Sequence, residues 1–260
     1  MTMKIENYVA PAETFTWDYN PNTFDDSISS NYTITNIDYQ RYHIFVSGGG
    51  VAPKSIILTG HFSGDDKNTD YQTLSGHFIE NTKLKKLYFE STKFYLGVGK
   101  EIKKTYSGGR TNFLDYVATF ETVVGVLFSD TQYTHTDGEA EITNNGNVNT
   151  FVEEIAGNVI SGANPIVISD DLGNQITIPA ASLTTDQAVV ISFVKMVDSG
   201  DGIYVTEYNY TTVAGTQIKT VQTTDGFGIL QVAPAATSAT ISVANLDGPY
   251  TIKFRNAYSA

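Results

Sequence analysis

The sequence predicts a mainly β protein, with an N-terminal α+β domain followed by a C-terminal β-sandwich. Only 17% of the residues are charged, so Thr, Ser, Asn and Gly must supply much of the polar surface. Tyr and Phe, present in 16 and 14 copies, favour strands because their rings pack on a pleated, half-buried face. Short apolar runs recur between turn residues, and only one segment has a convincing helical periodicity. At 260 residues, the chain can bury one large core or two ordinary ones.

One helix is expected in the first half. Three apolar residues beginning at Tyr71 stand at i, i+3 and i+7, which predicts a helix over residues 69–81 with one apolar stripe. Thr69 and Gln72 have the spacing of a capping box at its start. Asn81 is expected to end it.

Strands are expected on both sides of this helix. Residues 55–62 form a β-branched run that is too short for a buried helix. Downstream, Leu87 and Phe89 are expected to face Phe94 and Leu96 across a hairpin. The element order of strands, helix and strands indicates a helix packed on a sheet.

A change of composition after Phe128 predicts a domain boundary near residue 130. The strand before it, at residues 116–121, alternates between two differently exposed faces. Residues 129–149 are rich in Thr, Asp, Asn and Gly, and Asn144–Asn147 is the strongest turn signal in the chain. Beyond it, turns separate short strands at the spacing of a sandwich. The expected strands are residues 166–168, 176–178, 189–194, 203–205, 240–243 and 250–254. In the last of these, Tyr250, Ile252 and Phe254 are expected on the buried face, and Thr251, Lys253 and Arg255 on the wet one.

The formal net charge of -12 disfavours contact with a phosphate backbone, except where basic residues gather. Seven lysines between Lys83 and Lys104 are interleaved with aromatic residues, which is one pattern of a nucleic-acid surface. The alternation there favours strands with solvated lysines on their outer face. The chain has no cysteine, so neither disulfides nor thiolate metal sites are expected. It shows no apolar leader and no apolar run long enough for a membrane helix, so we expect a soluble protein without a standard export signal or membrane insertion.

Motifs for nucleotide or metal chemistry are incomplete. Residues 48–55 approach a P-loop, but Pro53 replaces the second glycine and a strand follows where the motif needs a helix. The segment Asp198–Gly202 resembles a calcium loop in composition yet lacks its ligand spacing, so a hairpin turn is favoured. The four histidines, none of them paired at metal-ligand spacing, are His43, His61, His77 and His135.

Motifs for hydrolysis are equally incomplete. No Gly-x-Ser-x-Gly elbow is present. Adjacent acidic pairs at residues 25–26, 153–154 and 170–171 are interpreted as solvated turns or faces rather than glycosidase carboxylates. We therefore expect no enzyme, with no catalytic, cofactor-binding or metal-binding residues and no cofactor.

Six segments, taken in order, resemble the distal tail proteins of siphophages. In the first half they are residues 53–62, 69–81 and 108–120, the last reading Gly-Gly-Arg-Thr-Asn-Phe-Leu-Asp-Tyr-Val-Ala-Thr-Phe. In the second half they are residues 144–150, 227–234 and 252–258. The resemblance implies a tail-tube-like domain over residues 1–130, made of a sheet sandwich plus one helix. It also implies a galectin-like or jelly-roll-like β-sandwich over residues 131–260.

The resemblance further implies a structural virion protein, made in the host cytoplasm. Its first domains would form a ring, hexameric in this family, that continues the tail tube at the distal end of a long non-contractile tail. The second domains would carry hub, fibre or receptor-binding proteins, and DNA would pass through the lumen without specific binding. A closed ring needs a heterologous interface, for which Trp17 and exposed tyrosines of the first domain are candidate anchors.

Two other functions remain open from the sequence. A tail tube or tail-terminator subunit would share the sheet-plus-helix unit. Alternatively, the C-terminal sandwich could contact glycans, because sugars stack on exposed aromatic rings. Tyr204, Tyr208 and Tyr210 are the candidates, although tyrosines that alternate on a strand are more often packing residues.

Overall fold

The computed structural model describes most of the chain. It covers residues 3–8, 13–18, 21, 23–25, 54–79, 83–88, 90–105, 112–136, 142–180, 183–192, 208–212, 217–221, 230–234 and 239–259. The protein is mainly β, with one helix among these residues, so the predicted fold class is confirmed at that level. No helix within the described ranges has the length and apolarity to cross a bilayer.

The first half contains seven strands and the helix. They are β1 (Lys4–Asn7), β2 (Thr14–Thr16), β3 (Thr23–Asp25), β4 (Ser55–Ser63), α1 (Lys67–Ile79), β5 (Lys85–Tyr88), β6 (Lys93–Thr105) and β7 (Phe113–Thr136). In the second half, the described elements of secondary structure are all strands. They are β8 (Thr150–Val159), β9 (Ile166–Asp170), β10 (Gln175–Ile178), β11 (Ala188–Ser192), β12 (Tyr208–Thr212), β13 (Gln217–Val221), β14 (Gln231–Val232), β15 (Ile241–Ala244) and β16 (Leu246–Ser259).

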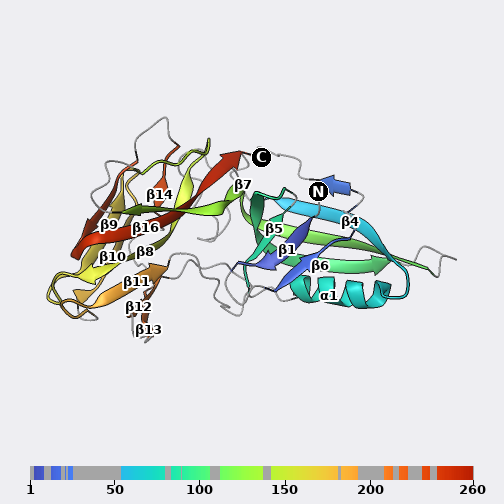
Figure 1. The fold of residues 1–260 in the computed structure, drawn as a ribbon, viewed down its shortest axis with the longest axis horizontal. Helices are drawn as coiled ribbons and strands as arrows, with labels where there is room; N and C mark the ends of the chain where they lie inside the picture. Colours follow the sequence, from blue (N-terminus) through green and yellow to red (C-terminus); the bar gives the residue numbers. More distant parts are fainter. Residues whose placement is uncertain are drawn as a thin grey trace, which may run out of the picture.

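The strands form an elongated molecule with two lobes (Figure 1). Thirteen strands belong to one sheet whose main order is β13-β12-β11-β8-β16-β7-β6-β5-β1-β2, with β14 paired to β8 and β4 paired to both β3 and β7. A second sheet has the order β10-β9-β15. The N-terminal lobe contains β1–β6 and α1, and the C-terminal lobe contains β8–β15. The long strands β7 and β16 run between the lobes.

The helix α1 packs against one face of the N-terminal sheet. Leu74 and Phe78 are buried there, as the predicted stripe requires, and Tyr71 is half-buried. The predicted cap is wrong. Because the helix begins at Lys67, Thr69 already lies in its first turn, and the Asp70 N–H donates to the Asp66 carbonyl at 2.9 Å. The predicted end at Asn81 lies outside the described residues.

The hairpin of β5 and β6 exists, but its register differs from the prediction. Leu87 lies opposite Tyr95, and Tyr88 lies opposite Phe94. A slip of one residue exchanges the two faces of a strand. Leu87 therefore packs in the N-terminal core, whereas Phe94 and Leu96 point to the other side of the sheet. Phe89 lies outside the described residues.

The strand β4 confirms the predicted strand at residues 55–62 and pairs along its whole length with β7. The predicted alternation in β7 is confirmed too. Tyr116, Ala118 and Phe120 are buried, while Val117 is exposed. However, β7 continues through residue 130 to Thr136, where the composition indicated a polar connection. The division into domains at 130 stays a prediction.

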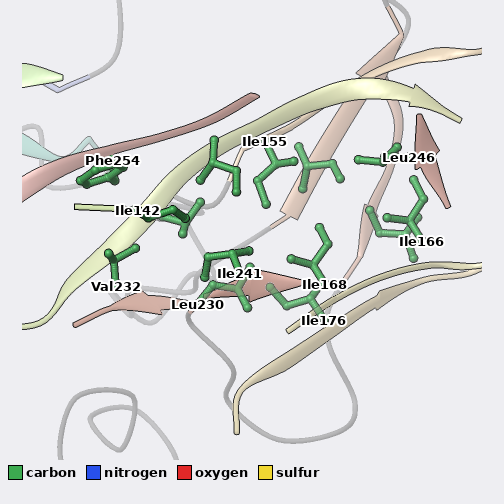
Figure 2. Close-up of a cluster of buried hydrophobic side chains, with 14 of the residues drawn as sticks. Ile142, Ile155, Ile166, Ile168, Ile176, Leu230, Val232, Ile241, Leu246 and Phe254 are labelled. Carbon is green, nitrogen blue, oxygen red and sulfur yellow. The ribbon is translucent and has the colours of Figure 1, made fainter. Parts of the chain in front are cut away.

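The C-terminal lobe is a two-layer β structure with an aliphatic core. The core side chains of β9, β10 and β15 face those of β8, β11 and β16 across the space shown in Figure 2. The isoleucines of this core are each 6% exposed or less: Ile142, which precedes β8, and Ile155, Ile166, Ile168, Ile176, Ile178, Ile191, Ile241 and Ile252 in the strands. All buried members of this core come from residues 142–254, and Tyr133 of β7 packs against them.

The predicted C-terminal strands at residues 166–168, 176–178, 240–243 and 250–254 are confirmed by β9, β10, β15 and β16. For residues 189–194, β11 confirms the part that ends at Ser192, and the rest lies outside the described residues. Residues 203–205 also lie outside them. The strand β8 was missed because its polar residues interrupt the apolar alternation.

Candidate functional site at the junction of the two lobes

The lobes meet where the pairing of β7 with β16 is interrupted. Ala257 lies opposite Phe128, but Arg255 lies opposite Gln132, so residues 129–131 bulge opposite the single residue Asn256. A bulge disrupts the hydrogen-bond ladder, increases the twist and re-aims nearby side chains. Up to Ser129, β7 also pairs with β6, and it leaves the N-terminal lobe there.

Arg255 fills this interruption. Its Nη1 donates to the Ser129 carbonyl at 3.3 Å and also to the Asp130 carbonyl, and its Nε donates to Glu153 Oε1 at 2.9 Å. The side chains of Arg255 and Glu153 are only 12% and 6% exposed. A guanidinium suits this position because its donors lie in a rigid planar fork.

Glu153 is aimed at the junction by a second bulge. The register of β16 with β8 passes from Lys253 opposite Glu154 to Phe254 opposite Val152, which leaves Glu153 as the extra residue. Besides Arg255, Glu153 accepts a hydrogen bond from Gln132 Nε2 at 2.5 Å. Its carboxylate thus bridges β16 and β7.

Tyr8, just after β1, reaches the same carboxylate from the N-terminal lobe. Burial, with the charge and hydrogen bond of Glu153, raises the pKa of the Tyr8 phenol well above its usual range, although Arg255 opposes the rise. The phenol is therefore neutral at physiological pH.

A second group of polar side chains joins β1, β5 and the β7 bulge. The Tyr88 hydroxyl lies 2.9 Å from Glu6 Oε1 and 2.5 Å from Asp130 Oδ1. Lys86 Nζ lies 3.3 Å from Glu6 and 3.9 Å from Asp130. Burial, followed by these contacts with Asp130 and Glu6, raises the pKa of Tyr88 far above its usual value.

Aromatic rings pack in a layer next to these polar groups. Phe128 of β7 lies 6.0 Å from Phe94 of β6 and 5.1 Å from Phe151 of β8, measured between ring centroids. The Phe94 ring also lies 5.2 Å from Lys86 Nζ and 5.6 Å from Arg255 Cζ, within the range of cation–π contacts. One buried cluster thus contains residues from both lobes.

The Asn-rich turn predicted at residues 144–147 packs against β16 beside the same interruption. The Asn145 N–H donates to Asn256 Oδ1 at 2.9 Å, and the Asn147 N–H donates to the Ala257 carbonyl at 3.0 Å. A Cβ at Gly146 would lie 1.8 Å from the Ala257 oxygen, so only glycine allows this approach. The turn is therefore a packed contact and not a free linker.

The N-terminal lobe has a second feature, a sheet face opposite α1. Ile57 of β4 and Phe113 and Val117 of β7 are 42%, 37% and 40% exposed on it. Nearby charges on β6 and β7 occur as the ion pairs Lys100–Glu121 and Lys103–Glu101. An exposed apolar group on a sheet face is a feature of protein contact surfaces.

Trp17 is wrong as a predicted anchor for a ring interface, whereas the tyrosines outside the described residues stay a prediction. Trp17 is 1% exposed, and its Nε1 donates to the Tyr116 hydroxyl at 2.8 Å inside the N-terminal core. Burial raises the pKa of Tyr116 to about 12, although the hydrogen bond from Trp17 opposes the rise. Each described tyrosine of the first half is buried or half-buried.

The described acidic pairs are split by their strands and turns. Glu153 faces the junction, while Glu154 pairs with Lys253 at 2.6 Å. Asp170 is not solvated as expected. Its carboxylate accepts from the Leu172 and Asn174 N–H groups, from Asn174 Nδ2 and from the Gln231 N–H, at 2.7–3.0 Å. Its neighbour Asp171 is exposed. These carboxylates hold turns and strands together.

The lysines of residues 83–104 do not share one face. Lys85 is fully buried and donates to Asn7 Oδ1 at 2.5 Å. Ion pairs to carboxylates involve Lys86, Lys93, Lys100 and Lys103. Among the described residues, no group of three or more His, Cys, Asp or Glu side chains could hold a metal ion.

Several predicted features cannot be placed. His43, residues 48–53, Asp198–Gly202 and Tyr204 lie outside the described residues, and nothing is described of the side chains of residues 25, 208 and 210. The Arg255–Glu153 pair, in contrast, was missed. Alternation placed Arg255 on a wet face, and the two partners lie 102 residues apart. The adjacent acidic residues Glu153 and Glu154 were the only local signal.

Comparison with known proteins gives likenesses in structure only. No family model matches the chain, and no curated protein matches its sequence. A chain of the phage P2 baseplate in its activated conformation with Ca is 11% identical, with a TM-score of 0.50 over 98% of this chain and 97% of that chain. A chain of the same baseplate with Sr is 11% identical, with a TM-score of 0.48 over 97% of each chain. The SPP1 Dit protein, described as a paradigm of the hub adsorption apparatus in phages that infect Gram-positive hosts, is 13% identical. Its TM-score is 0.41, over 80% of this chain and 79% of that chain.

The chain thus has the fold of a phage baseplate protein, shared over nearly its whole length. The resemblance to siphophage distal tail proteins predicts a protein of this kind, and it is confirmed at the level of a baseplate fold.

Proposed function

We propose that the protein is a structural component of a virion, located at the distal end of a long non-contractile tail. It forms a ring, hexameric in our proposal, that links the tail tube to the tail tip and the receptor-binding apparatus. Residues 1–130 build the ring, and residues 131–260 form the peripheral docking domain. The protein has no enzymatic role in this proposal, and DNA passes through the ring without specific binding.

The observation that carries the proposal is the continuity of β7 and β16 between the lobes. A strand that belongs to both lobes transmits force between them without a flexible linker. If the N-terminal lobe forms the ring and the C-terminal lobe carries partner proteins, such strands would hold the two lobes in a fixed orientation around the tail axis. The exposed apolar group Ile57, Phe113 and Val117 supports protein contacts by the N-terminal lobe. Closure of the ring requires that this lobe present two different, complementary surfaces.

Negative-stain microscopy of the purified chain, alone and with the tail tube protein of the same virus, tests the proposal. We expect rings with six-fold symmetry around an open centre. Because the chain has no cysteine, Gln72→Cys on α1 and Ser242→Cys on β15 each provide a unique biotinylation site on an exposed residue. Bound streptavidin should lie farther from the ring axis in Ser242→Cys than in Gln72→Cys. A solitary subunit under both conditions, or labels in the reverse order, would contradict the proposal.

A further inference from the structure

We propose that the junction is a hinge-prone break in the sheet that side chains hold rigid, and that Arg255 is the positioning residue that sets the angle between the lobes. This goes beyond ring formation, because it concerns a property of each single subunit. The structure brings together a break in two strand ladders and a buried guanidinium that fills it.

The break is the natural place for bending. Both ladders of β16 lose register within a few residues, toward β8 between Lys253 and Phe254 and toward β7 between Arg255 and Ala257. Interrupted ladders have fewer interstrand hydrogen bonds and bend more easily than regular ones. Without other contacts, the two lobes would pivot at this point.

Arg255 replaces the lost ladder bonds on one side. Its guanidinium donates to two carbonyls of the β7 bulge and to Glu153 of the β8 bulge, so three strands are tied to one planar group. A lysine has the charge but lacks the fork, so it cannot make these contacts together. Loss of Arg255 would also leave the Glu153 carboxylate buried without its cation.

Asp130 connects the hydrogen bonds of Arg255 to the N-terminal lobe. The backbone carbonyl of Asp130 accepts from Arg255, while its carboxylate lies 2.5 Å from the Tyr88 hydroxyl of β5. On the other side of β16, the turn at residues 144–147 holds Asn256 and Ala257 by backbone contacts. The break is therefore held from both sides, and Arg255 provides one of the links between the lobes, the one that lies directly at the break.

Distance measurements between spin labels on the full-length chain test this inference. Labels on Gln72→Cys and Ser242→Cys report the separation of α1 from β15, and measurements at low protein concentration keep the subunit monomeric. We expect one narrow distance distribution for the otherwise unchanged chain. Arg255→Met should widen it at least two-fold, and Arg255→Lys should give an intermediate width.

Lys253→Met is the matched control. Lys253 lies two residues away on β16, and its side chain pairs with Glu154 rather than with Glu153 or the bulge of β7. This variant should keep the narrow distribution. Circular dichroism of each variant establishes that the lobes are folded.

Equal, narrow distributions in folded Arg255→Met and Lys253→Met would overturn the inference. If Arg255→Met does not fold, Glu153→Gln and Arg255→Lys decide instead, and narrow distributions in both would overturn it. The result is independent of the ring, because a subunit that never forms rings can still show the expected widening.

Discussion

At the scale of single residues, Tyr88 illustrates how the junction depends on neutralised charge. Its one hydroxyl proton faces two carboxylates, Glu6 and Asp130. A phenol can donate to only one of them at a time, so a cation is needed to offset the remaining negative charge. Lys86 lies close enough to both carboxylates to do this. The group therefore stabilises the fold only while its charges are balanced.

Glu6 gives this group a predictable pH dependence. Burial opposes its ionisation, but hydrogen bonds from Lys4 and Tyr88 and the charges of Lys86 and Lys4 outweigh it, so its pKa is lowered from 4.5. A group with a lowered pKa in the folded state stabilises at pH values above 4.5 and loses that contribution as the pH falls through the folded pKa.

We therefore expect Glu6→Gln to lower the free energy of unfolding by about 1–2 kcal/mol at pH 7. The difference from the unchanged protein should shrink below pH 4.5. Urea titrations at a series of pH values measure it. Glu101→Gln, which removes an exposed ion pair with Lys103, should cost little at any pH. A difference for Glu6→Gln that persists undiminished at acid pH would refute the assignment.

At the scale of elements, the contact between α1 and β6 depends on a glycine. A Cβ at Gly99 would lie 2.4 Å from Phe78 Cα, so the helix can approach the strand only because no side chain intervenes. Gly76, in contrast, lies on the exposed side of α1 with nothing within 4 Å of its Cβ position. The same substitution should therefore have opposite effects at the two positions.

We expect Gly99→Ala to destabilise the protein by about 1–3 kcal/mol, because the helix or the strand must shift. Gly76→Ala should stabilise it by about 0.5–1 kcal/mol, because alanine is the better helix former. Midpoints of urea denaturation measure both changes. An unchanged midpoint in Gly99→Ala would show that α1 does not pack closely on β6.

At the scale of the whole molecule, the aromatic layer of the junction should make the lobes unfold together. Phe94, Phe128 and Phe151 belong to one buried cluster that draws on strands of both lobes. The single tryptophan, Trp17, is buried in the N-terminal lobe and reports its unfolding by fluorescence. Circular dichroism reports both lobes.

We expect the two signals to coincide in the unchanged protein and to separate in Phe128→Ala, which should also cost about 3–5 kcal/mol. Ile168→Val is the control, because it removes one methyl group from a core that lies wholly in the C-terminal lobe. It should cost about 0.5–1.5 kcal/mol and leave the signals coincident. Coincident signals in Phe128→Ala would mean that the layer does not couple the lobes.

Local patterns in the sequence determined much of the fold. Short apolar runs between turn residues predicted β4, β9 and β10, alternation predicted the buried face of β7, and the stripe from Tyr71 predicted α1. These succeed because a strand or helix that covers one core repeats its apolar residues with the period of its own backbone. The order of such segments also carried the resemblance to distal tail proteins, and the structure has the fold of a phage baseplate protein.

Only the tertiary structure decided which long-range partners these elements have. The register of β5 and β6, the burial of Trp17 and the pairing of Arg255 with Glu153 each depend on residues far apart in the chain. Periodicity predicts how a strand is exposed when its ladder is regular, and it fails at bulges, where one extra residue re-aims a side chain. The junction consists of such bulges, so its residues looked like ordinary surface charges in the sequence.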